Sequence, residues 1–548
     1  MVDGAVIDRD FQALEFAYRP SPDQQASEPP FHDVVVVGAG PVGLALAIDL
    51  AQRGIRVLVL DDDYRLSSGS RAICFAKRTL EIFDRLGCGD RMVDKGVSWS
   101  VGKVFFKDAA LYRFDLTPET GHCRPAFINL QMYYVEGFLA ERALALENLE
   151  LRWKNRVAGL RQTDGHVELE IDTPDGRYRL QAGHVVACDG SRSAMRTLMG
   201  LESKGRVFQD RFLIADIRTS ADLLPGGANE RWFWFDPPFH PNQSVLLHRQ
   251  PDNVWRVDFQ LGWDADPVEE KKPENIVPRV RALLAASPAK DVDFTLEWAS
   301  VYTFACMRME RFRHGRVLFA GDSAHGVSPF GARGANSGVQ DAENLAWKLA
   351  LVVRGAAPDT LLDSYADERE FAADENIRCS TRATDFITPK TEISRLFRDA
   401  VLGLAREHPF ARRLVNSGRL SVPATLPASG LITPDVDAFA SDMVPGAVVG
   451  DAPLVGAAGP TWLLRELGAD FTLLCFGEAP GWAASSAWRT VAIGSVGLRD
   501  VDGVATQRYD ARPGTVYLIR PDHHICARWR TPDPECVRAA LDRAMARG

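Results

Sequence analysis

Glycine and acid residues near the start of the sequence have the spacing of a phosphate-binding turn. Gly38, Gly40 and Gly43 follow the apolar run Val34–Val37, and a second apolar run ends at Asp61. In a strand–turn–helix unit such glycines permit a tight turn and a close approach to pyrophosphate, and the acid accepts hydrogen bonds from a ribose. The pattern predicts binding of a dinucleotide, either FAD or NAD(P). The alternative is a tight turn followed by a chance acid.

Two later turns also join an acid to a glycine at the end of an apolar run. The pair Asp189–Gly190 follows the run 184–188, and the pair Gly321–Asp322 follows the run 316–320. In parallel α/β sheets, ligands bind beyond the carboxyl ends of the strands. The three turns therefore predict one ligand site to which three strand ends contribute.

The composition excludes several classes of partner and cofactor. The chain has 548 residues, of which 46% are hydrophobic and 25% charged, so we expect two or three globular domains. A net charge of −9 disfavours nucleic acid and anionic membranes as partners. The nine cysteines are scattered, so neither a metal centre nor a disulfide framework is expected. Acids near the first residue disfavour a signal peptide, and a cytoplasmic protein is expected.

The stretch 205–307 has the pattern of an antiparallel sheet. Residues 244–262 predict a hairpin that turns at Pro251–Asn253. Apolar and polar residues alternate along the second strand, which predicts one buried face and one polar face. In the run 231–235, the Trp and Phe side chains are expected on opposite faces.

Taken together, these motifs resemble those of the class A flavoprotein aromatic monooxygenases. The most similar branch contains phenol, pentachlorophenol and 3-(3-hydroxyphenyl)propionate hydroxylases. The glycine motif is joined by Asp-Gly-x-x-Ser-x-x-Arg at Asp189–Arg196 and by Gly321–Asp322 followed by Pro329. The resemblance implies an α/β fold with a glutathione-reductase-type FAD-binding Rossmann domain, an antiparallel-sheet substrate domain and a C-terminal thioredoxin-like domain.

The resemblance also implies how the chain is divided. It suggests a homodimer whose C-terminal domain lacks C-x-x-C and so has a packing role rather than a redox role. The expected parts are an N-terminal arm at 1–30, an FAD-binding domain at 31–204 and 308–390, a substrate-binding sheet at 205–307, a helical connection at 391–438 and a thioredoxin-like domain at 439–548.

Cofactor contacts follow from the same resemblance. Asp322 is expected to accept hydrogen bonds from the flavin's ribitol chain, and Arg71 and Gln131 to contact the pyrophosphate or ribityl of FAD. For Arg71 the alternative is a solvated charge, and for Gln131 a polar residue at a helix N-terminus. The full set of expected cofactor residues is Gly38, Gly40, Pro41, Gly43, Asp61, Asp62, Arg71, Gln131, Val157, Asp189, Asp322, Pro329, Gly334, Ala335 and Asn336.

The loop after Asp322 must pass the flavin ring closely, and Gly331 and Gly334 remove side chains there. Related enzymes often have Gly-Gly-x-Gly at this point, whereas this chain has Ala332 and Arg333 after the first glycine. Arg333 is a candidate for holding an anionic substrate or the reduced flavin, and the alternative is an outward-pointing surface charge.

A long helix follows this loop. Ser337 and Gln340 have the spacing of a capping box, which predicts the start of the helix, and Gly355 predicts its end. Its N-terminus is expected to point at the flavin's pyrimidine edge, where negative charge gathers on reduction. His325 is expected to brace the loop rather than to transfer protons.

The chemistry implied by the resemblance is hydroxylation of a phenolic compound. NADPH or NADH reduces FAD, and reaction with O2 gives a flavin C4a-hydroperoxide whose distal oxygen is attacked by the electron-rich ring. An apolar roof excludes water from that intermediate. Tyr302 is our candidate for contact with the phenol, and a packed strand tyrosine is the alternative. The substrate is either a simple phenol or a larger polyketide or drug-like aromatic that is hydroxylated or epoxidised. A flavin-binding protein without catalysis is the non-enzymatic reading.

Overall fold

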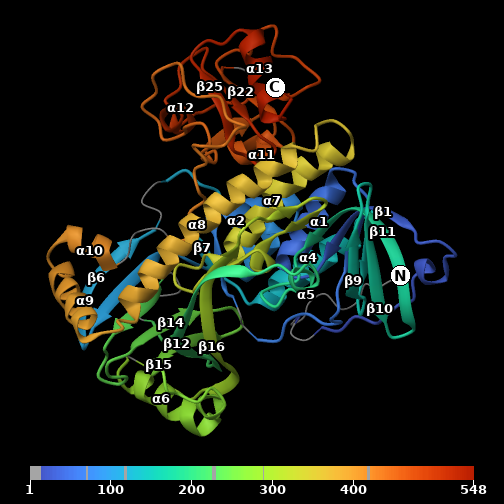
Figure 1. Cartoon of the computed structure of the whole chain (residues 1–548). Coiled ribbons are helices and arrows are strands. Elements are labelled where there is room, and N and C mark those ends of the chain that lie inside the picture. Colours follow the sequence, from blue (N-terminus) through green and yellow to red (C-terminus); the bar gives the residue numbers. More distant parts are fainter. Residues whose placement is uncertain are drawn as a thin grey trace.

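The computed structural model arranges the chain around a central set of sheets, with the C-terminal part at one end and the N-terminal strands at another (Figure 1). None of the described helices is long and apolar enough to cross a membrane. The structure describes residues 11, 14–69, 72–116, 120–224, 230–287, 289–415, 420–495 and 497–547.

The first sheet contains the three strands that precede the glycine and acid turns. It is an 8-stranded sheet with the order β17-β18-β11-β1-β2-β8, in which β18, β11, β1, β2 and β8 are parallel. Strand β11 also pairs with the antiparallel strand β10, which in turn pairs with β9. The strands are β1 (Phe31–Val37), β2 (Val57–Leu60), β8 (Leu149–Arg152), β9 (Arg156–Gln162), β10 (Val167–Thr173), β11 (Gly176–Ala187), β17 (Arg313–His314) and β18 (Val317–Phe319).

Helices pack on this sheet, and α1 is the most enclosed of them. Residues Gly43–Ala51 of α1 are all buried, because the helix lies between β1 and the helices α4 and α7. Its sequence is apolar almost all round, with Asp49 as the exception, which is the pattern of a buried helix. The helices are α1 (Pro41–Gln52), α2 (Lys77–Leu86), α3 (Gly89–Lys95), α4 (Met132–Leu144), α5 (Ala194–Leu198), α7 (Gly334–Val353) and α8 (Leu361–Ile387).

The second sheet has 8 strands in the order β19-β16-β12-β15-β14-β13-β5-β6. One face packs on α6 (Pro273–Ala285) through residues such as Leu213, Val257 and Val280. The sheet extends beyond 205–307, because β5 pairs in parallel with β13 and brings β6 with it. The strands are β5 (Val101–Phe106), β6 (Ala109–Asp115), β12 (Ser203–Arg218), β13 (Glu230–Phe235), β14 (Ser244–Arg249), β15 (Val254–Leu261), β16 (Thr295–Met309) and β19 (His325–Gly326).

A small sheet with the order β3-β7-β4 joins the second sheet to α7. Its strands are β3 (Cys74–Ala76), β4 (Val97–Trp99) and β7 (Phe127–Asn129). The Asn129 amide donates to the carbonyl of Arg249 in β14 (2.8 Å). On the other side, the backbone N–H of Ala76 donates to the side chain of Asn336 in α7 (2.8 Å).

Helices connect these sheets to the C-terminal part. After α8 come α9 (Glu392–Ala405) and α10 (Pro409–Val415), which pack on each other at the edge of the molecule near β6 (Figure 1). The C-terminal strands form a 4-stranded sheet with the order β23-β22-β24-β25 and a 2-stranded sheet of β20 and β21. The elements are β20 (Pro453–Gly456), β21 (Gly459–Trp462), α11 (Leu463–Leu467), β22 (Thr472–Phe476), β23 (Arg489–Ile493), α12 (Val504–Arg508), β24 (Val516–Ile519), β25 (Ile525–Trp529) and α13 (Pro534–Ala544).

Buried ion pairs attach the C-terminal part to α7 and α8. Glu368 of α8 accepts from Arg520 (2.6 Å) and from Lys348 of α7 (2.8 Å). These three side chains are at most 3% exposed. Arg520 and Lys348 outweigh the effect of burial and hold the pKa of Glu368 well below its usual range. Removing one partner of such a buried pair leaves an uncompensated charge, so this contact fixes how the two parts dock.

Most of the predicted strands and helices are confirmed, with one clear error at a helix start. The hairpin of β14 and β15 turns at Pro251–Asn253 as predicted. The prediction that Ser337 caps the helix is wrong, because α7 already begins at Gly334. The Ser337 hydroxyl instead accepts from Asn376 of α8 (3.2 Å).

Candidate active site

The three glycine and acid turns lie side by side at the carboxyl edge of the first sheet. In the strand register, Val37 is opposite both Leu60 and Ala187, and Ala187 is opposite Phe319. The turns are joined by backbone hydrogen bonds, since the Cys188 N–H donates to the Val37 carbonyl (2.7 Å). The predicted convergence of three strand ends is therefore confirmed.

The first turn is shaped by glycines with different surroundings. A Cβ on Gly43 would lie 1.9 Å from the carbonyl oxygen of Gly38, and one on Gly38 would lie 2.5 Å from that of Cys188. A Cβ on Gly40 would meet nothing within 4 Å. Gly40 caps α1 without a side-chain hydrogen bond, and Pro41 is the first helical residue. The turn therefore leaves open space at the N-terminus of α1, where an anion is favoured.

Asp61 lies beside this turn at the end of β2. Its carboxylate accepts hydrogen bonds from the backbone N–H groups of Ala39 and Asp63. Burial raises the pKa of Asp61, and those two hydrogen bonds oppose the rise. The neighbouring Asp62 is exposed.

The second and third turns are tied together by Arg196. Its guanidinium donates to the carbonyls of Ser191 (2.7 Å) and Ser323 (2.8 Å). One oxygen of Asp189 accepts from the Met195 N–H (2.9 Å), while the other is buried without a partner. Burial raises the pKa of Asp189.

Asp322 projects from the third turn and keeps surface in contact with solvent. Many protein atoms nevertheless lie near its carboxylate and reduce its solvation. This crowding raises the pKa of Asp322. Behind it, Asp341 of α7 accepts from the Gly321 N–H (3.0 Å) and from His325 (2.6 Å). Arg369 and His325 hold the pKa of Asp341 below its usual value despite burial. His325 thus braces the loop, as expected.

The start of α7 presents backbone groups rather than side chains. Its first internal hydrogen bond runs from the Ser337 N–H to the Arg333 carbonyl (2.8 Å), so the preceding N–H groups of Gly334, Ala335 and Asn336 are not used by the helix. The Asn336 side chain is already engaged, because it donates to the Cys74 carbonyl (2.9 Å) and accepts from Ala76.

Of the two predicted catalytic residues, one lies inside the protein and one is partly open. Arg333 is 4% exposed and donates to the Phe330 carbonyl (2.9 Å), so the alternative of an outward surface charge is wrong. Tyr302 lies in β16 opposite Phe212 and is 38% exposed. The geometry places neither side chain on a reacting atom, so both roles stay predictions.

The remaining predicted cofactor residues lie in different settings. Gln131 precedes α4, is buried, and donates to the Pro251 carbonyl (3.3 Å), while its side-chain oxygen has no partner. Val157 is buried in β9, and Pro329 is exposed in the loop before α7. Arg71 lies outside the described residues.

A row of polar side chains on one face of the second sheet is buried, which the sequence did not predict. The sequence predicted one buried face and one polar face for β15, and in the structure the polar face is buried as well. Arg256 is 5% exposed and its neighbour in β14, His248, only 1%. This face is covered by the small sheet, whose Cys74 contacts Arg231 of β13 (3.4 Å). A strand shows the same alternation of polar and apolar residues whether water or protein covers its polar face. The burial of this face could therefore not be predicted from the sequence of the strand.

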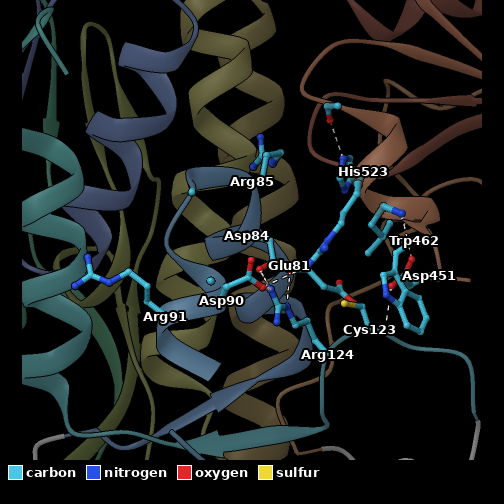
Figure 2. Close-up of a pocket in the computed structure, with 15 residues that line it drawn as sticks. Glu81, Asp84, Arg85, Asp90, Arg91, Cys123, Arg124, Asp451, Trp462 and His523 are labelled. Carbon is cyan, nitrogen blue, oxygen red and sulfur yellow. Dashed lines mark hydrogen bonds and ion pairs between the residues drawn. The ribbon is translucent and has the colours of Figure 1, made fainter. Parts of the chain in front are cut away.

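Two cavities lie next to this region, at the contact with the C-terminal part. One of about 320 Å³ is lined by α2, α3, the segment around Cys123, and residues 451–468 and His523 (Figure 2). Figure 2 shows Arg124 directed at Asp84 and Asp90, with which it forms ion pairs. The second, of about 760 Å³, extends from Ala76 and Phe127 toward Arg508. Glu81 lines both cavities.

The strand-end site fits flavin adenine dinucleotide. The open space at Gly40 admits a pyrophosphate, and the exposed Asp322 carboxylate and the unpartnered Asp189 oxygen are acceptors suited to hydroxyl groups. The unused N–H groups of α7 are donors suited to a flavin's carbonyl edge. Among the described residues no cluster that could bind a metal ion is present.

Comparisons with known proteins agree with this fit. Residues 32–380 match the family described as FAD binding domain, and residues 442–548 match that described as aromatic-ring hydroxylase, C-terminal. A 3-(3-hydroxy-phenyl)propionate/3-hydroxycinnamic acid hydroxylase of Mycolicibacterium gilvum is 30% identical over 93% of this chain and 92% of its own. A probable NADH-specific resorcinol 4-hydroxylase of Rhodococcus jostii is 30% identical over 90% of this chain and 91% of its own.

A solved structure shows the same fold. It is the flavin-dependent monooxygenase PieE in complex with FAD and substrate, with a TM-score of 0.80, 20% identity, and coverage of 95% of this chain and 100% of that one. The chain belongs to the FAD-dependent aromatic-ring hydroxylases, the class A flavoprotein monooxygenases. FAD and a reduced nicotinamide are its cofactors.

A matched pair of glycine substitutions tests the first turn. Gly43→Ala places a Cβ against the backbone of Gly38 and should lower the free energy of unfolding by about 2–3 kcal/mol. The new methyl group of Gly40→Ala meets no protein atom, so this variant should fold and lose less than about 1 kcal/mol of its free energy of unfolding. It should nevertheless weaken FAD binding at least about tenfold, because the methyl group lies where we expect the pyrophosphate to approach. Urea unfolding and FAD titration measure the two effects. Unchanged FAD affinity in Gly40→Ala would contradict the placement of the pyrophosphate.

Glu81 gives a prediction about pH. Burial raises its pKa to about 7, although Arg78 (3.3 Å) and Lys77 oppose the rise, and Asp451 adds to it. Because this value lies above the usual 4.5, the protonated carboxyl contributes stability that is complete below pH 4.5 and is lost as the pH rises through 7. Glu81→Gln should therefore raise the stability at pH 8 by about 1–2 kcal/mol relative to the parent and leave it unchanged at pH 4.5.

The measurement for Glu81 is the melting temperature of both proteins from pH 4.5 to pH 8. Glu141→Gln provides a control, since Glu141 lies outside both cavities and its side chain is 24% exposed. Curves for Glu81→Gln and the parent that run parallel across the range would show that Glu81 does not titrate there.

Proposed function

We propose that this enzyme hydroxylates a phenolic aromatic compound, with NADPH or NADH as electron donor and O2 as oxidant. The observation that carries the proposal is the convergence of three strand ends on one site whose open space and acceptors suit FAD. Two relatives that are 30% identical over nearly the whole chain are named for phenolic substrates, which supports the choice of a phenol.

The residues of the chain bind and orient the flavin and keep water away from it. The N-terminus of α1, with Gly40 and Pro41, would face the pyrophosphate, and Asp61 would accept hydrogen bonds from the ribose. Asp322 would accept hydrogen bonds from the ribityl chain. Bound FAD would supply the redox chemistry: uptake of hydride from the nicotinamide and transfer of one oxygen atom of O2 to the substrate ring, with the other oxygen atom released as water. The N-terminus of α7 would stabilise negative charge on the flavin.

Tyr302 and Arg333 have different roles in this proposal. Tyr302 is 38% exposed on the face of the second sheet that carries Phe212, and we propose that it contacts a substrate hydroxyl there. Arg333 acts as a positioning residue, because its guanidinium holds the Phe330 carbonyl and packs against Gly331, where a Cβ would lie 2.0 Å from it. It therefore fixes the loop that passes the flavin ring.

We also propose that residues 439–548 form a thioredoxin-like domain without redox function. The order β23-β22-β24-β25, with β22 parallel to β23 and antiparallel to β24, supports this topology. In the described segment between β22 and β23 no helix is present, and Cys475 and Cys526 are buried, which fits a packing role.

Oxidation of the nicotinamide tests the function directly. The purified enzyme with FAD should oxidise NADH or NADPH at least about tenfold faster when a suitable phenol is present, and should yield a hydroxylated product. The panel should include simple phenols, phenols with an acidic side chain, and a polycyclic phenol. Tyr302→Phe should lower kcat/KM for the best substrate about tenfold or more if the hydroxyl contacts the phenol. A flavin-loaded protein with no phenol-stimulated oxidation would contradict the function, and unchanged turnover in Tyr302→Phe would dismiss that residue.

We propose that the enzyme is a homodimer joined through α9 and α10. Large apolar side chains form a stripe along these helices, and Ile393, Leu396, Phe397 and Phe410 are 58–81% exposed. Groups of large apolar side chains exposed together in this way mark interaction surfaces. Leu396→Glu together with Phe397→Glu should convert the dimer to a monomer in light scattering at micromolar concentration, while Val501→Glu, at a residue 65% exposed elsewhere, should not. A parent protein that is already monomeric would contradict the proposal.

A further inference from the structure

The N-terminal arm pairs with the segment that follows β2. The Phe16 N–H donates to the Tyr64 carbonyl (2.6 Å), and the Leu66 N–H donates to the Leu14 carbonyl (2.9 Å). These two hydrogen bonds flank an antiparallel bridge, so the arm runs here as a short extra strand. The match to the family of FAD-binding domains begins at residue 32, so this strand lies before the matched part of the chain.

Aromatic side chains attach the arm on both sides of this pairing. The Phe16 ring stacks on the buried Trp153 at 4.5 Å, with 9° between the ring planes. Phe11 is buried and makes an edge contact with Phe138 of α4 at 5.4 Å. A Cβ on Gly137 would lie 2.5 Å from the Phe11 ring, so the glycine makes room for that ring on the helix. The arm is therefore fixed both to α4 and to the turn between β8 and β9.

The segment that pairs with the arm begins at the proposed ribose acceptor. It runs from Asp61 to Gly69 and is held at further points. Ser67 donates to the Glu136 carboxylate of α4 through its N–H (2.7 Å) and its hydroxyl (2.8 Å). Gly69 lies against the Trp298 ring of β16, since a Cβ there would be 2.3 Å from the ring. The arm pairs with the stretch between Asp61 and Ser67.

This pairing limits the freedom of the segment before a ligand binds. Asp62, Asp63 and Arg65 are exposed, so burial of their side chains contributes little to holding the segment in place. Each backbone residue that has to be ordered when a ligand binds reduces the affinity. A segment that is already ordered by the arm would meet the adenosine half of FAD without this loss.

We infer that the N-terminal arm is a clamp for the adenosine half of FAD, because its pairing with residues 61–69 positions Asp61 for the ribose and thereby makes the enzyme retain its cofactor. The inference rests on the proposed function through the contact of Asp61 with the ribose, and it does not depend on the identity of the aromatic substrate. Phe16 is a positioning residue in this account, since it acts through the segment 61–69 and not on FAD itself.

Variants of Phe16 in the full chain test the clamp. Phe16→Pro removes the N–H that donates to Tyr64 and the ring that stacks on Trp153, whereas Phe16→Ala removes only the ring. The dissociation constant of FAD is measured from the flavin fluorescence released on dilution of the holoenzyme. We expect it to rise at least about tenfold in Phe16→Pro and about threefold in Phe16→Ala. Phe31→Ala is the matched control, because Phe31 is 55% exposed at the start of β1, and it should change the constant less than about twofold.

Two further readouts separate positioning from a general loss of stability. ADP carries the adenosine half of FAD without the flavin, so its dissociation constant, from competition with FAD, should rise by the same factor as that of FAD. The kcat at saturating FAD should fall less than about twofold, because the arm acts on the adenosine side of the site. An FAD constant that is unchanged in Phe16→Pro, an ADP constant that does not follow it, or a large loss of kcat at saturating FAD would overturn the inference.

Hydrogen exchange in the parent enzyme tests the clamp without a variant. Coupling between two sites is reciprocal, so an arm that strengthens FAD binding must itself open less often when FAD is bound. The amides of Phe16 and Leu66 should exchange at least about tenfold more slowly with FAD bound than after its removal. Equal exchange in the two forms would show that the arm is not coupled to FAD, and this measurement decides alone if Phe16→Pro does not fold.

Failure of the clamp is distinguishable from failure of the proposed function. Asp61→Ala should weaken FAD binding at least about tenfold if the acid contacts the ribose. If Asp61→Ala weakens FAD binding and Phe16→Pro does not, the FAD site stands and the arm is not a clamp. If neither variant changes the affinity for FAD, the proposed placement of the ribose is contradicted together with the clamp. Oxidation of NADH or NADPH stimulated by a phenol tests the hydroxylation separately in each case.

Discussion

Parallel pairing of β1 with β2 and β11, and of β11 with β18, determines the position of the whole candidate site. Parallel strands end at the same edge, so Gly38, Asp61, Asp189 and Asp322 come together although they are far apart in the sequence. These strands are apolar and buried, which stabilises their pairing. At the turns, glycine avoids the clash that a Cβ would make with neighbouring backbone atoms. The acids can then act on one dinucleotide.

Helix α7 connects this edge to the rest of the molecule. The N–H groups of Gly334, Ala335 and Asn336 in its first turn are not used by the helix, and the Asn336 side chain holds β3. One turn later Asp341 braces the Gly321 turn, and Lys348 reaches the buried ion pair with Glu368 and Arg520. Through these contacts α7 is joined both to the turn at Gly321 and to the C-terminal part.

The site was predictable from the sequence where local geometry demands a residue type. Gly38 needs a positive φ, and Gly43 leaves no room for a Cβ, so both appear as glycines in a recognisable spacing. The start of α7 was not predictable from Ser337, because the helix begins at Gly334 and no side-chain hydrogen bond caps it. The burial of Arg231 and His248 was missed because it depends on a separate sheet covering their face.

A crystal structure of the protein with FAD is the most direct test of the central claim. We expect one FAD per chain, with its pyrophosphate at Gly40 and the N-terminus of α1, its ribityl at Asp322 and its ring at the N-terminus of α7. FAD found at any other place, or a folded and colourless protein that does not take up FAD, would contradict it.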